Sequence, residues 1–422
     1  MHCSAFGLEN PKNPICGRRP GRLMNRVNRQ SMGDQTMTRT LRYEPLDLRT
    51  LTDPYPVYRQ LRDEAPVFWH EQMQSWVLTR YRDCREVLRN HELFARDRRR
   101  IGEEVPEFRQ SVQTLDPPEQ GALRSLFVNT LHAQDFDEIG RRARNRIAEL
   151  FGHLADRDGF DWMKEIAAPI SLAISADLLG VQEPDLPSYI SISDALARRM
   201  DSGLLPANAE AGDRARGLLN TMVKAWFDAE DCSGALGDIR QDADKARVPD
   251  HYVRNTTSVL FNASFGTLYA TAGNVALTLL QHPEALERLR DERLLSTGVD
   301  ELVRFDGPAQ GTSRVATRRT MIGTTVVDPG QIVLPLLAAA NRDPEEFPQP
   351  DELVLDRSPN RHLGFGWGPH ACLGASFGQV AVKEIIRGLL AAPGPLRLAG
   401  VPTRRRTATV RSLDVLPVTF RP

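Results

Sequence analysis

The sequence predicts an α+β protein that is mostly helical, and three observations lead to this fold class. Residues 136–230 show one helical pattern after another, separated by Pro, Gly and Asp. Residues 255–281 contain no charged side chain, which is typical of a helix buried on all sides. Strand-like patterns occur towards both ends of the chain, in residues 66–80 and 312–344. Both ends therefore supply β-structure around a helical middle.

The elements can be justified in chain order. Residues 66–80 predict a hairpin, because apolar side chains recur at about every second position. The helical middle has three clear patterns, at residues 137–157, 168–180 and 215–230. The uncharged helix 255–281 would be about 40 Å long at ~1.5 Å per residue, so its middle lies near the centre of the protein. Its many Asn, Ser and Thr side chains argue against a membrane span.

Composition argues against several classes of protein. The 422 residues carry 54 Lys and Arg against 55 Asp and Glu, so the net charge of -1 favours neither nucleic acid nor a membrane as partner. The five cysteines lie far apart without a CxxC motif, which argues against a disulfide framework and a zinc site. We therefore expect a cytoplasmic location.

Two parts of different character are expected along the chain. Residues 1–40 are rich in Arg, Asn, Gly and Pro and lack the apolar run of a signal peptide or membrane anchor, so they predict a disordered tail. Residues 41–422 contain no internal repeat and no low-complexity linker. They are expected to form a single domain.

A glycine-rich segment near the end, "HLGFGWGPHACLGASFG" at residues 362–378, surrounds Cys372 with five glycines. A nucleophile elbow at residues 374–378 is disfavoured, because no strand precedes it and all nine histidines come before Ser376. A dinucleotide-binding turn is disfavoured because Pro369 interrupts it and no buried strand leads into it. Two interpretations remain: a buried structural cysteine, or a metal ligand.

The metal-ligand interpretation has a physical basis in the residues around Cys372. Glycines allow backbone N–H groups to approach a thiolate sulfur closely. The helix-like run 375–390 begins just after the cysteine, and its positive N-terminal end favours the thiolate. The sequence contains no CxxCH motif, so it does not indicate covalent attachment of a haem.

Residues 365–374, "FGWGPHACLG", resemble the FxxGxxxCxG signature of the cytochrome P450 family of thiolate-haem monooxygenases. Further family landmarks follow in order across roughly residues 41–422. The resemblance implies a cytochrome P450 fold with haem b bound through Cys372 as the metal ligand. It also implies a set of cofactor-binding positions: Gln120, Arg124, Arg314, His362, Phe365, Gly366, Gly368, His370 and Gly374. Gln120 stands where many bacterial members have histidine.

A second landmark is the family's ExxR motif, which matches Glu301 and Arg304. Taken alone, an i,i+3 ion pair on a helix is commonplace. By resemblance, Arg357 completes a buried network with these two residues. We expect this network to be structural, bracing the chain beneath the haem.

By resemblance, the uncharged helix 255–281 crosses the face of the haem that binds dioxygen, here called the oxygen side. Its sequence departs from the family pattern. Where many members read AGxET or AGxDT, this chain has Ala263, Gly266 and Thr267, so the alcohol is retained and the acid is absent. We predict that the Thr267 hydroxyl bonds the Ala263 carbonyl and that Gly266 weakens the same turn, which would kink the helix. Protons must then come through water, another side chain or the substrate. Hydroxylation and oxidative coupling of aromatic substrates both remain open.

The resemblance places substrate contacts in segments 94–115, 185–215 and 308–312 and near the C-terminus. The candidate pocket residues are Phe265, Pro308, Thr312 and Leu413. Arg96, Arg98, Arg99 and Arg100 either bind an acidic or carrier-bound substrate or form a solvated face.

The resemblance implies oxidation of a small organic molecule, such as a natural-product intermediate, with dioxygen and two electrons. Electrons would come from NAD(P)H through a ferredoxin reductase and a ferredoxin that docks on the Cys372 side, near Lys383 and Arg387. Neither nucleic acid nor a membrane is expected as a partner. Oxidative coupling is the alternative reaction, and a non-catalytic haem-binding sensor is the alternative of another class.

Overall fold

The structure, a computed structural model, describes residues 43–421. The predicted tail of residues 1–40 lies outside the described residues. The helices are α1 (Leu48–Thr52), α2 (Tyr55–Glu64), α3 (Tyr81–Arg89), α4 (Glu119–Ala133), α5 (Phe136–Leu154), α6 (Ala168–Leu179), α7 (Leu186–Arg199), α8 (Asn208–Asp228), α9 (Gly234–Ala246), α10 (Asp250–Gln281), α11 (Pro283–Arg288), α12 (Glu292–Asp306), α13 (Leu337–Ala340) and α14 (Ala375–Leu390). The strands are β1 (Val67–His70), β2 (Ser75–Leu78), β3 (Phe94–Ala95), β4 (Phe160–Asp161), β5 (Arg314–Ala316), β6 (Thr320–Ile322), β7 (Thr325–Val327), β8 (Ile332–Pro335), β9 (Arg397–Leu398), β10 (Thr403–Arg404), β11 (Leu413–Val415) and β12 (Pro417–Thr419).

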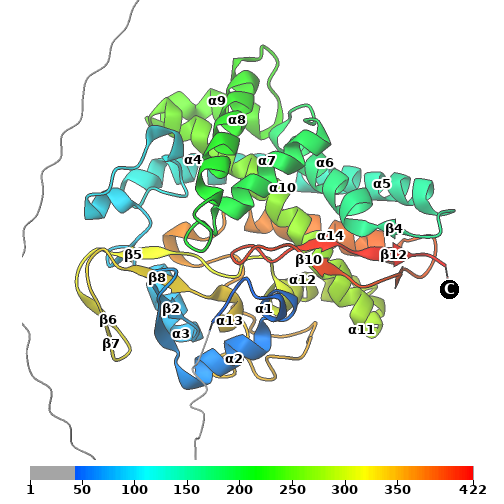
Figure 1. The fold of residues 1–422 in the computed structure, drawn as a ribbon. Helices are drawn as coiled ribbons and strands as arrows, with labels where there is room; N and C mark the ends of the chain where they lie inside the picture. Colours follow the sequence, from blue (N-terminus) through cyan, green and yellow to red (C-terminus); the bar gives the residue numbers. More distant parts are fainter. Residues whose placement is uncertain (1–42, 422) are drawn as a thin grey trace, which may run out of the picture. The chain divides into compact units, whose positions relative to one another are not determined.

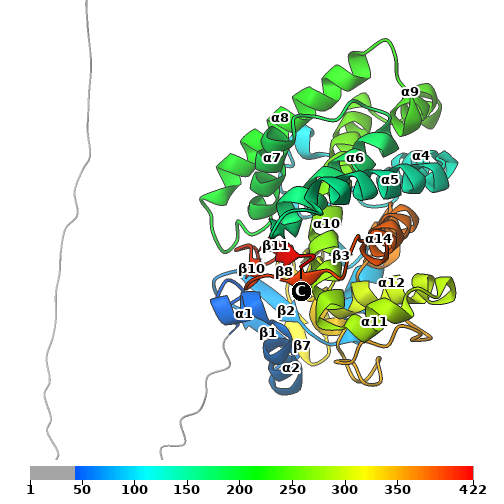
Figure 2. The same cartoon turned by 90° about the vertical axis from the view of Figure 1, so that its right-hand side faces the viewer.

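The predicted class, mostly helical α+β, is confirmed. Helix α10 runs through the middle of the described chain, with α4 to α9 on one side and the largest sheet with α1 to α3 on the other (Figure 1). Figure 2 shows the same division after a quarter turn. Helices α6, α8 and α14 all contact α10. Side chains on α10 are therefore surrounded by most of the structure.

The largest sheet joins strands from the two segments, towards either end of the chain, that the sequence predicts to be β-structure. Its five strands have the order β1-β2-β8-β5-β3. The predicted hairpin is β1 and β2, which pair antiparallel with Phe68 opposite Val77. Strand β2 then pairs parallel with β8, placing Trp76 opposite Val333. Because β5 also pairs with β8, the segment just before β5 is held against the N-terminal strands.

Helix α10 is buried as predicted, apart from one stretch near its middle. Every residue from 268 to 279 is buried, whereas Ala263 and Thr267 are exposed. These two residues lie one turn apart on the same helix face. Exposure in the middle of an otherwise buried helix means that this face borders an open space. Among residues 43–421, no helix combines the length and hydropathy needed to cross a bilayer.

The predicted hydrogen bond from the Thr267 hydroxyl to the Ala263 carbonyl is absent among residues 43–421, and the predicted kink stays a prediction. The helix is continuous across Ala263 to Thr267. Other hydroxyls bond back to the helix near this point: that of Ser264 donates to the Phe261 carbonyl at 2.9 Å, and that of Thr271 donates to the Thr267 carbonyl at 2.7 Å. The Thr267 hydroxyl itself has no hydrogen-bond partner among the described residues, so it is free to bind another molecule.

Candidate active site

The loop that carries Cys372 is a tight turn before α14. The Cys372 N–H donates to the Phe365 carbonyl at 2.8 Å, which closes the loop. Gly366 and Gly368 adopt φ of +71° and +73°, a region that side chains other than glycine rarely occupy. A Cβ on Gly368 would also lie 2.6 Å from the Leu88 carbonyl oxygen. The glycines therefore let this loop pack against α3 and present the cysteine.

The Cys372 side chain is exposed, although much of the protein surrounds it. Burial by the surrounding protein raises the pKa of the thiol. The two observations agree if the thiol lines an internal space. The N–H of Gly374 and the guanidinium of Arg124 act in the opposite direction and lower the pKa. The predicted backbone N–H directed at the sulfur is therefore present, at Gly374.

The predicted ion-pair network is assembled in the core. Arg304 donates twice to Glu301, with Nε–Oε2 at 2.7 Å and Nη2–Oε1 at 2.8 Å. Arg357 Nε lies 3.0 Å from the same Oε2. Glu301 is fully buried and Arg304 is 1% exposed. Both arginines also donate to backbone carbonyls of the segment before the Cys372 loop, among them that of Pro350 and that of Pro348. This geometry agrees with the expected bracing role.

Two of the predicted cofactor-binding arginines lack a counter-charge within residues 43–421. Arg124 donates to the Ala371 carbonyl at 2.9 Å and forms no ion pair there. Arg314 is 4% exposed, and it hydrogen-bonds only the Thr312 hydroxyl and the Ser313 carbonyl. Burial lowers the pKa of Arg314, since a buried cation without a partner is costly. Both positions therefore suit a group that brings its own negative charge.

In the sequence, Arg96 stands out only as part of a run of arginines. The structure places it beside Arg314. Its Nη1 donates to the Thr312 hydroxyl at 2.6 Å, and Arg314 Nη1 approaches the same hydroxyl at 3.2 Å. The sequence offers no signal for this contact, because the two arginines are far apart along the chain.

His370 and Gln120, both predicted as cofactor-binding, contact each other. The Gln120 amide donates to His370 Nδ1 at 3.0 Å, and His370 Nε2 lies 2.8 Å from Asp116 Oδ1. Burial lowers the pKa of His370 to about 4, against the effect of Asp116, so the imidazole is neutral at pH 7. Asp116 is a residue that sequence reasoning missed, although it belongs to the "DPPE" stretch that begins at that position.

His362, also predicted as cofactor-binding, has protein partners in this structure. Its Nδ1 accepts from the Gly364 N–H at 3.1 Å, and its Nε2 lies 3.6 Å from Asp300. Its contact with haem stays a prediction.

A cavity of about 670 Å³ lies on the exposed face of α10. Three of the predicted catalytic positions line it, namely Ala263, Gly266 and Thr267. Two predicted substrate-pocket residues, Pro308 and Thr312, line it as well. Its volume is in the range of small-molecule sites.

The other two pocket candidates differ from expectation. Phe265 borders the cavity but is only 2% exposed, because its ring packs between Tyr189 and Tyr269. It therefore offers little ring surface for stacking on a substrate. Leu413 is fully buried beside Gly273 and is not among the lining residues. Ser412, the residue just before β11, lines the cavity in its place.

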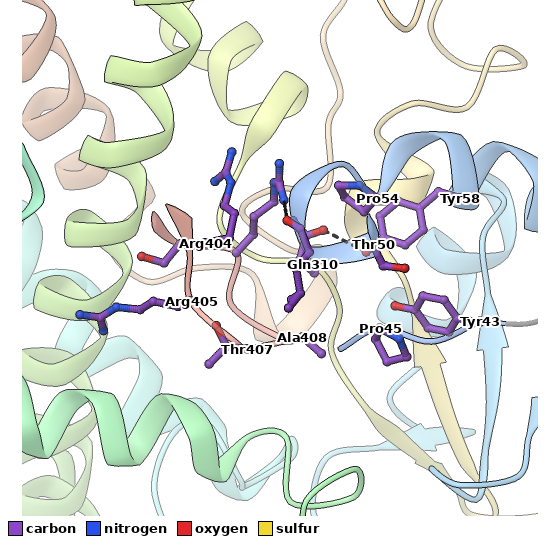
Figure 3. A pocket seen from close by; sticks show the side chains of 13 residues that line it. Tyr43, Pro45, Thr50, Pro54, Tyr58, Gln310, Arg404, Arg405, Thr407 and Ala408 are labelled. Atoms are coloured by element: carbon purple, nitrogen blue, oxygen red, sulfur yellow. Dashed lines mark hydrogen bonds between the residues drawn. The ribbon is translucent and has the colours of Figure 1, made fainter. Parts of the chain in front are cut away.

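A second pocket adjoins this cavity and shares Arg405, Thr407 and Ala408 with it. In Figure 3, Tyr43 and Tyr58 lie on one side of this pocket and residues 404–408 on the other. Its volume of about 20 Å³ is enough for roughly one water molecule. The larger cavity is therefore the candidate substrate site.

Comparison with known proteins identifies the family. Residues 235–392 match the family model described as Cytochrome P450. The chain is 30% identical over 391 residues to the cytochrome P450 monooxygenase PikC of Streptomyces venezuelae, covering 87% of this chain and 91% of that protein. The chain belongs to the cytochrome P450 family.

One further relative and one solved structure match this P450 over most of its length. It is 28% identical over 388 residues to the beta-dihydromenaquinone-9 omega-hydroxylase of Mycobacterium tuberculosis, which covers 90% of this chain and 78% of that protein. The crystal structure of CalO2 matches with a TM-score of 0.80 and 25% identity, covering 90% of this chain and 99% of that one. The protein is therefore an oxidoreductase of the monooxygenase type.

The residues of this P450 fit a haem. The exposed Cys372 side chain suits the thiolate ligand that a haem of this family would take. Arg124, Arg314 and Arg96 are cations without an ion-pair partner in the described chain, which suits the two propionates of a haem. Exposed Ala263 and Thr267 leave open space along α10.

Sequence reasoning missed one residue on the oxygen side of this P450. A Cβ built on Gly266 would lie 3.1 Å from the hydroxyl oxygen of Ser193 on α7. Ser193 also lines the cavity, and its hydroxyl has no hydrogen-bond partner among residues 43–421. A hydroxyl from α7 thus lies next to the position at which the family pattern has an acidic residue. Only the packing of α7 on α10 reveals it.

Proposed function

We propose that this P450 binds haem b through Cys372 and inserts one oxygen atom of dioxygen into a small organic molecule, such as a natural-product intermediate. The observation that carries the proposal is the exposed Cys372 side chain, which much of the protein surrounds, with the Gly374 N–H directed at it. Haem bound in this way supplies the activation of dioxygen. Arg124, Arg314 and His362 would hold its propionates.

Thr267 and Ser193 would handle protons and water in the cavity. Both have hydroxyls without a partner in the described chain, and Ser193 lies against Gly266 one residue before Thr267. A hydroxyl can accept one hydrogen bond and donate another, so it can orient water and pass a proton along it. This arrangement supports proton delivery through hydroxyls and water in place of the missing acid.

We expect Thr267→Ala to lower the product formed per NAD(P)H consumed by about a hundredfold, the low end of effects on proton transfer. Electrons would still be consumed because haem binding does not involve this side chain. The ratio is measured by following NAD(P)H absorbance and product together. Thr271→Ala is the matched control, since its hydroxyl bonds only the helix backbone. Equal ratios in the two variants would contradict a role for Thr267.

A ferredoxin is proposed to dock on the Cys372 side. Lys383 of α14 forms no hydrogen bond or ion pair within residues 43–421, so its ammonium group is available to an acidic partner. Arg387 is less available, since it pairs with Glu292 at 2.5 Å and with Glu384. Electrostatic docking weakens with added salt. We expect turnover to depend on an added ferredoxin and its reductase, and to slow as salt is added.

Oxidative coupling is the second candidate, because Gly266 leaves the oxygen side without a carboxylate. Compounds that shift the ferric haem spectrum identify a ligand, and turnover of that ligand under isotopically labelled dioxygen separates the reactions. We expect the label in the product. A coupled product without label would replace insertion by coupling. The absence of any substrate-dependent NAD(P)H use would favour a sensor.

A further inference from the structure

The cavity beside α10 has an unusual charge balance. Its charged lining residues are one aspartate, Asp201, and five arginines, namely Arg96, Arg98, Arg199, Arg216 and Arg405. The carboxylate of Asp201 does not balance the arginines, since it accepts hydrogen bonds from the backbone N–H groups of Ala408 and Thr409. The lining also includes Ile190, Leu196 and Val259. A ligand that matches this lining has an apolar body and a negative charge.

Four of these arginines have partners, and Arg216 has none. Arg98 pairs with Glu103, Arg405 bonds Asp194, and Arg96 bonds Thr312. Arg199 pairs with Asp213 at 2.6 Å. Within residues 43–421, Arg216 makes no hydrogen bond and no ion pair.

The neighbours of Arg216 add to its unbalanced charge. Asp213 binds Arg199 through one carboxylate oxygen and Arg109 through the other, at 2.6 and 2.5 Å. Three guanidinium groups thus lie near one carboxylate, and both of its oxygens are already bonded to Arg199 and Arg109. Burial and the nearby Arg199 lower the pKa of Arg216, as expected for a partly desolvated cation beside like charges.

The packing of α8 on α7 directs this cluster to the cavity. A Cβ on Gly212 of α8 would lie 2.3 Å from the Arg199 Cβ, so the two helices are in close contact there. Arg216 follows Gly212 by one turn and lies on the same face of α8. Both Arg199 and Arg216 line the cavity.

The cluster lies at a defined separation from the oxygen side. Ser193 of α7 contacts Gly266, and Arg199 is six residues further along the same helix. At ~1.5 Å per residue, the two positions are roughly 9 Å apart along α7. The backbone positions of the arginine cluster and of the oxygen side are therefore about two helical turns apart along α7.

We propose that Arg216, with Arg199, binds the carboxylate or phosphate of an amphipathic substrate whose apolar part extends towards Thr267. Guanidinium groups pair with both anions in the same forked geometry, so the chemistry is shared. This inference rests on the proposed function, because it names the substrate class of the same cavity.

The test compares matched acids and alcohols on the haem-loaded protein by isothermal titration calorimetry. The pairs are dodecanoate with 1-dodecanol and 2-naphthylacetate with 2-naphthylethanol, and dodecyl phosphate distinguishes a phosphate from a carboxylate. We expect at least one acid to bind about tenfold more tightly than its alcohol, in line with a charged hydrogen bond. R216Q should remove that preference while changing alcohol binding less than about twofold.

Arg214→Gln is the matched control, since Arg214 lies on the same helix but pairs with Glu210 on the surface. It should leave every affinity unchanged. The proposal is overturned if neither acid nor dodecyl phosphate is preferred over its alcohol, or if R216Q weakens acid and alcohol equally. Failure of the haem-thiolate assignment would appear separately, in the carbon monoxide spectrum of the unaltered protein.

Discussion

Cys372→Ser is expected to abolish the red-shifted carbon monoxide band of the reduced protein. A thiolate donates electron density to iron, whereas a serine hydroxyl stays neutral at pH 7 and is a poor ligand. The side chains are similar in size, so the loop closed by the Cys372 N–H and the Phe365 carbonyl should persist. The spectrum of the dithionite-reduced protein under carbon monoxide measures the effect.

Cys232→Ser is the control for this experiment. Cys232 lies in the segment before α9 and is partly exposed. Its thiol contacts the carbonyl of Trp226, which belongs to α8. The variant should keep the full band. If the band is unchanged in Cys372→Ser, Cys372 is not the ligand. The proposed function then loses the observation that carries it.

The features predicted best from the sequence depend on short segments. The Cys372 loop is one such feature, because its glycines and the start of α14 lie within a few residues of the sulfur. The Glu301 and Arg304 pair is another, since residues three apart on a helix meet on one face. The hairpin of β1 and β2 followed from alternation within one segment.

The features missed from the sequence depend on packing between distant segments. Ser193 reaches Gly266 only because α7 crosses α10, and Arg96 reaches Thr312 only because β3 pairs with β5. Periodicity within a segment carries no information about such contacts. The Thr267 hydrogen bond was predicted wrongly because several Thr residues on α10 can bond back to the helix, and Thr257 and Thr271 do so whereas Thr267 does not.

The charged groups show the same division between local and distant contacts. The run of arginines at residues 96–100 was compatible with a solvated face or with a binding role. The structure divides the run, since Arg96 lies beside Arg314 whereas Arg98 pairs with the partly exposed Glu103. Arg216 carried no signal at all in the sequence. Its importance comes from the absence of a partner, which only the packing of α7 and α8 reveals.

Glu301→Gln is expected to lower the free energy of unfolding by about 3–5 kcal/mol, the usual cost of breaking a buried ion pair. Glu301 is fully buried and is the carboxylate shared by Arg304 and Arg357. Glutamine fills the same volume but carries no charge, so both guanidinium groups would lose their counter-charge inside the protein. Urea unfolding followed by circular dichroism measures the change, and loss of haem absorbance in the same titration reports on the cofactor site.

Glu292→Gln provides the comparison that separates burial from ion pairing. Glu292 lies on the same helix, α12, and also pairs with an arginine, Arg387, but its side chain is 65% exposed. Solvent screens an exposed pair, so this substitution should cost no more than about 1 kcal/mol. If the two variants lose equal stability, the buried network is no brace. If Glu301→Gln loses haem at lower urea than it loses helical structure, the network stabilises the Cys372 loop more than the rest of the fold.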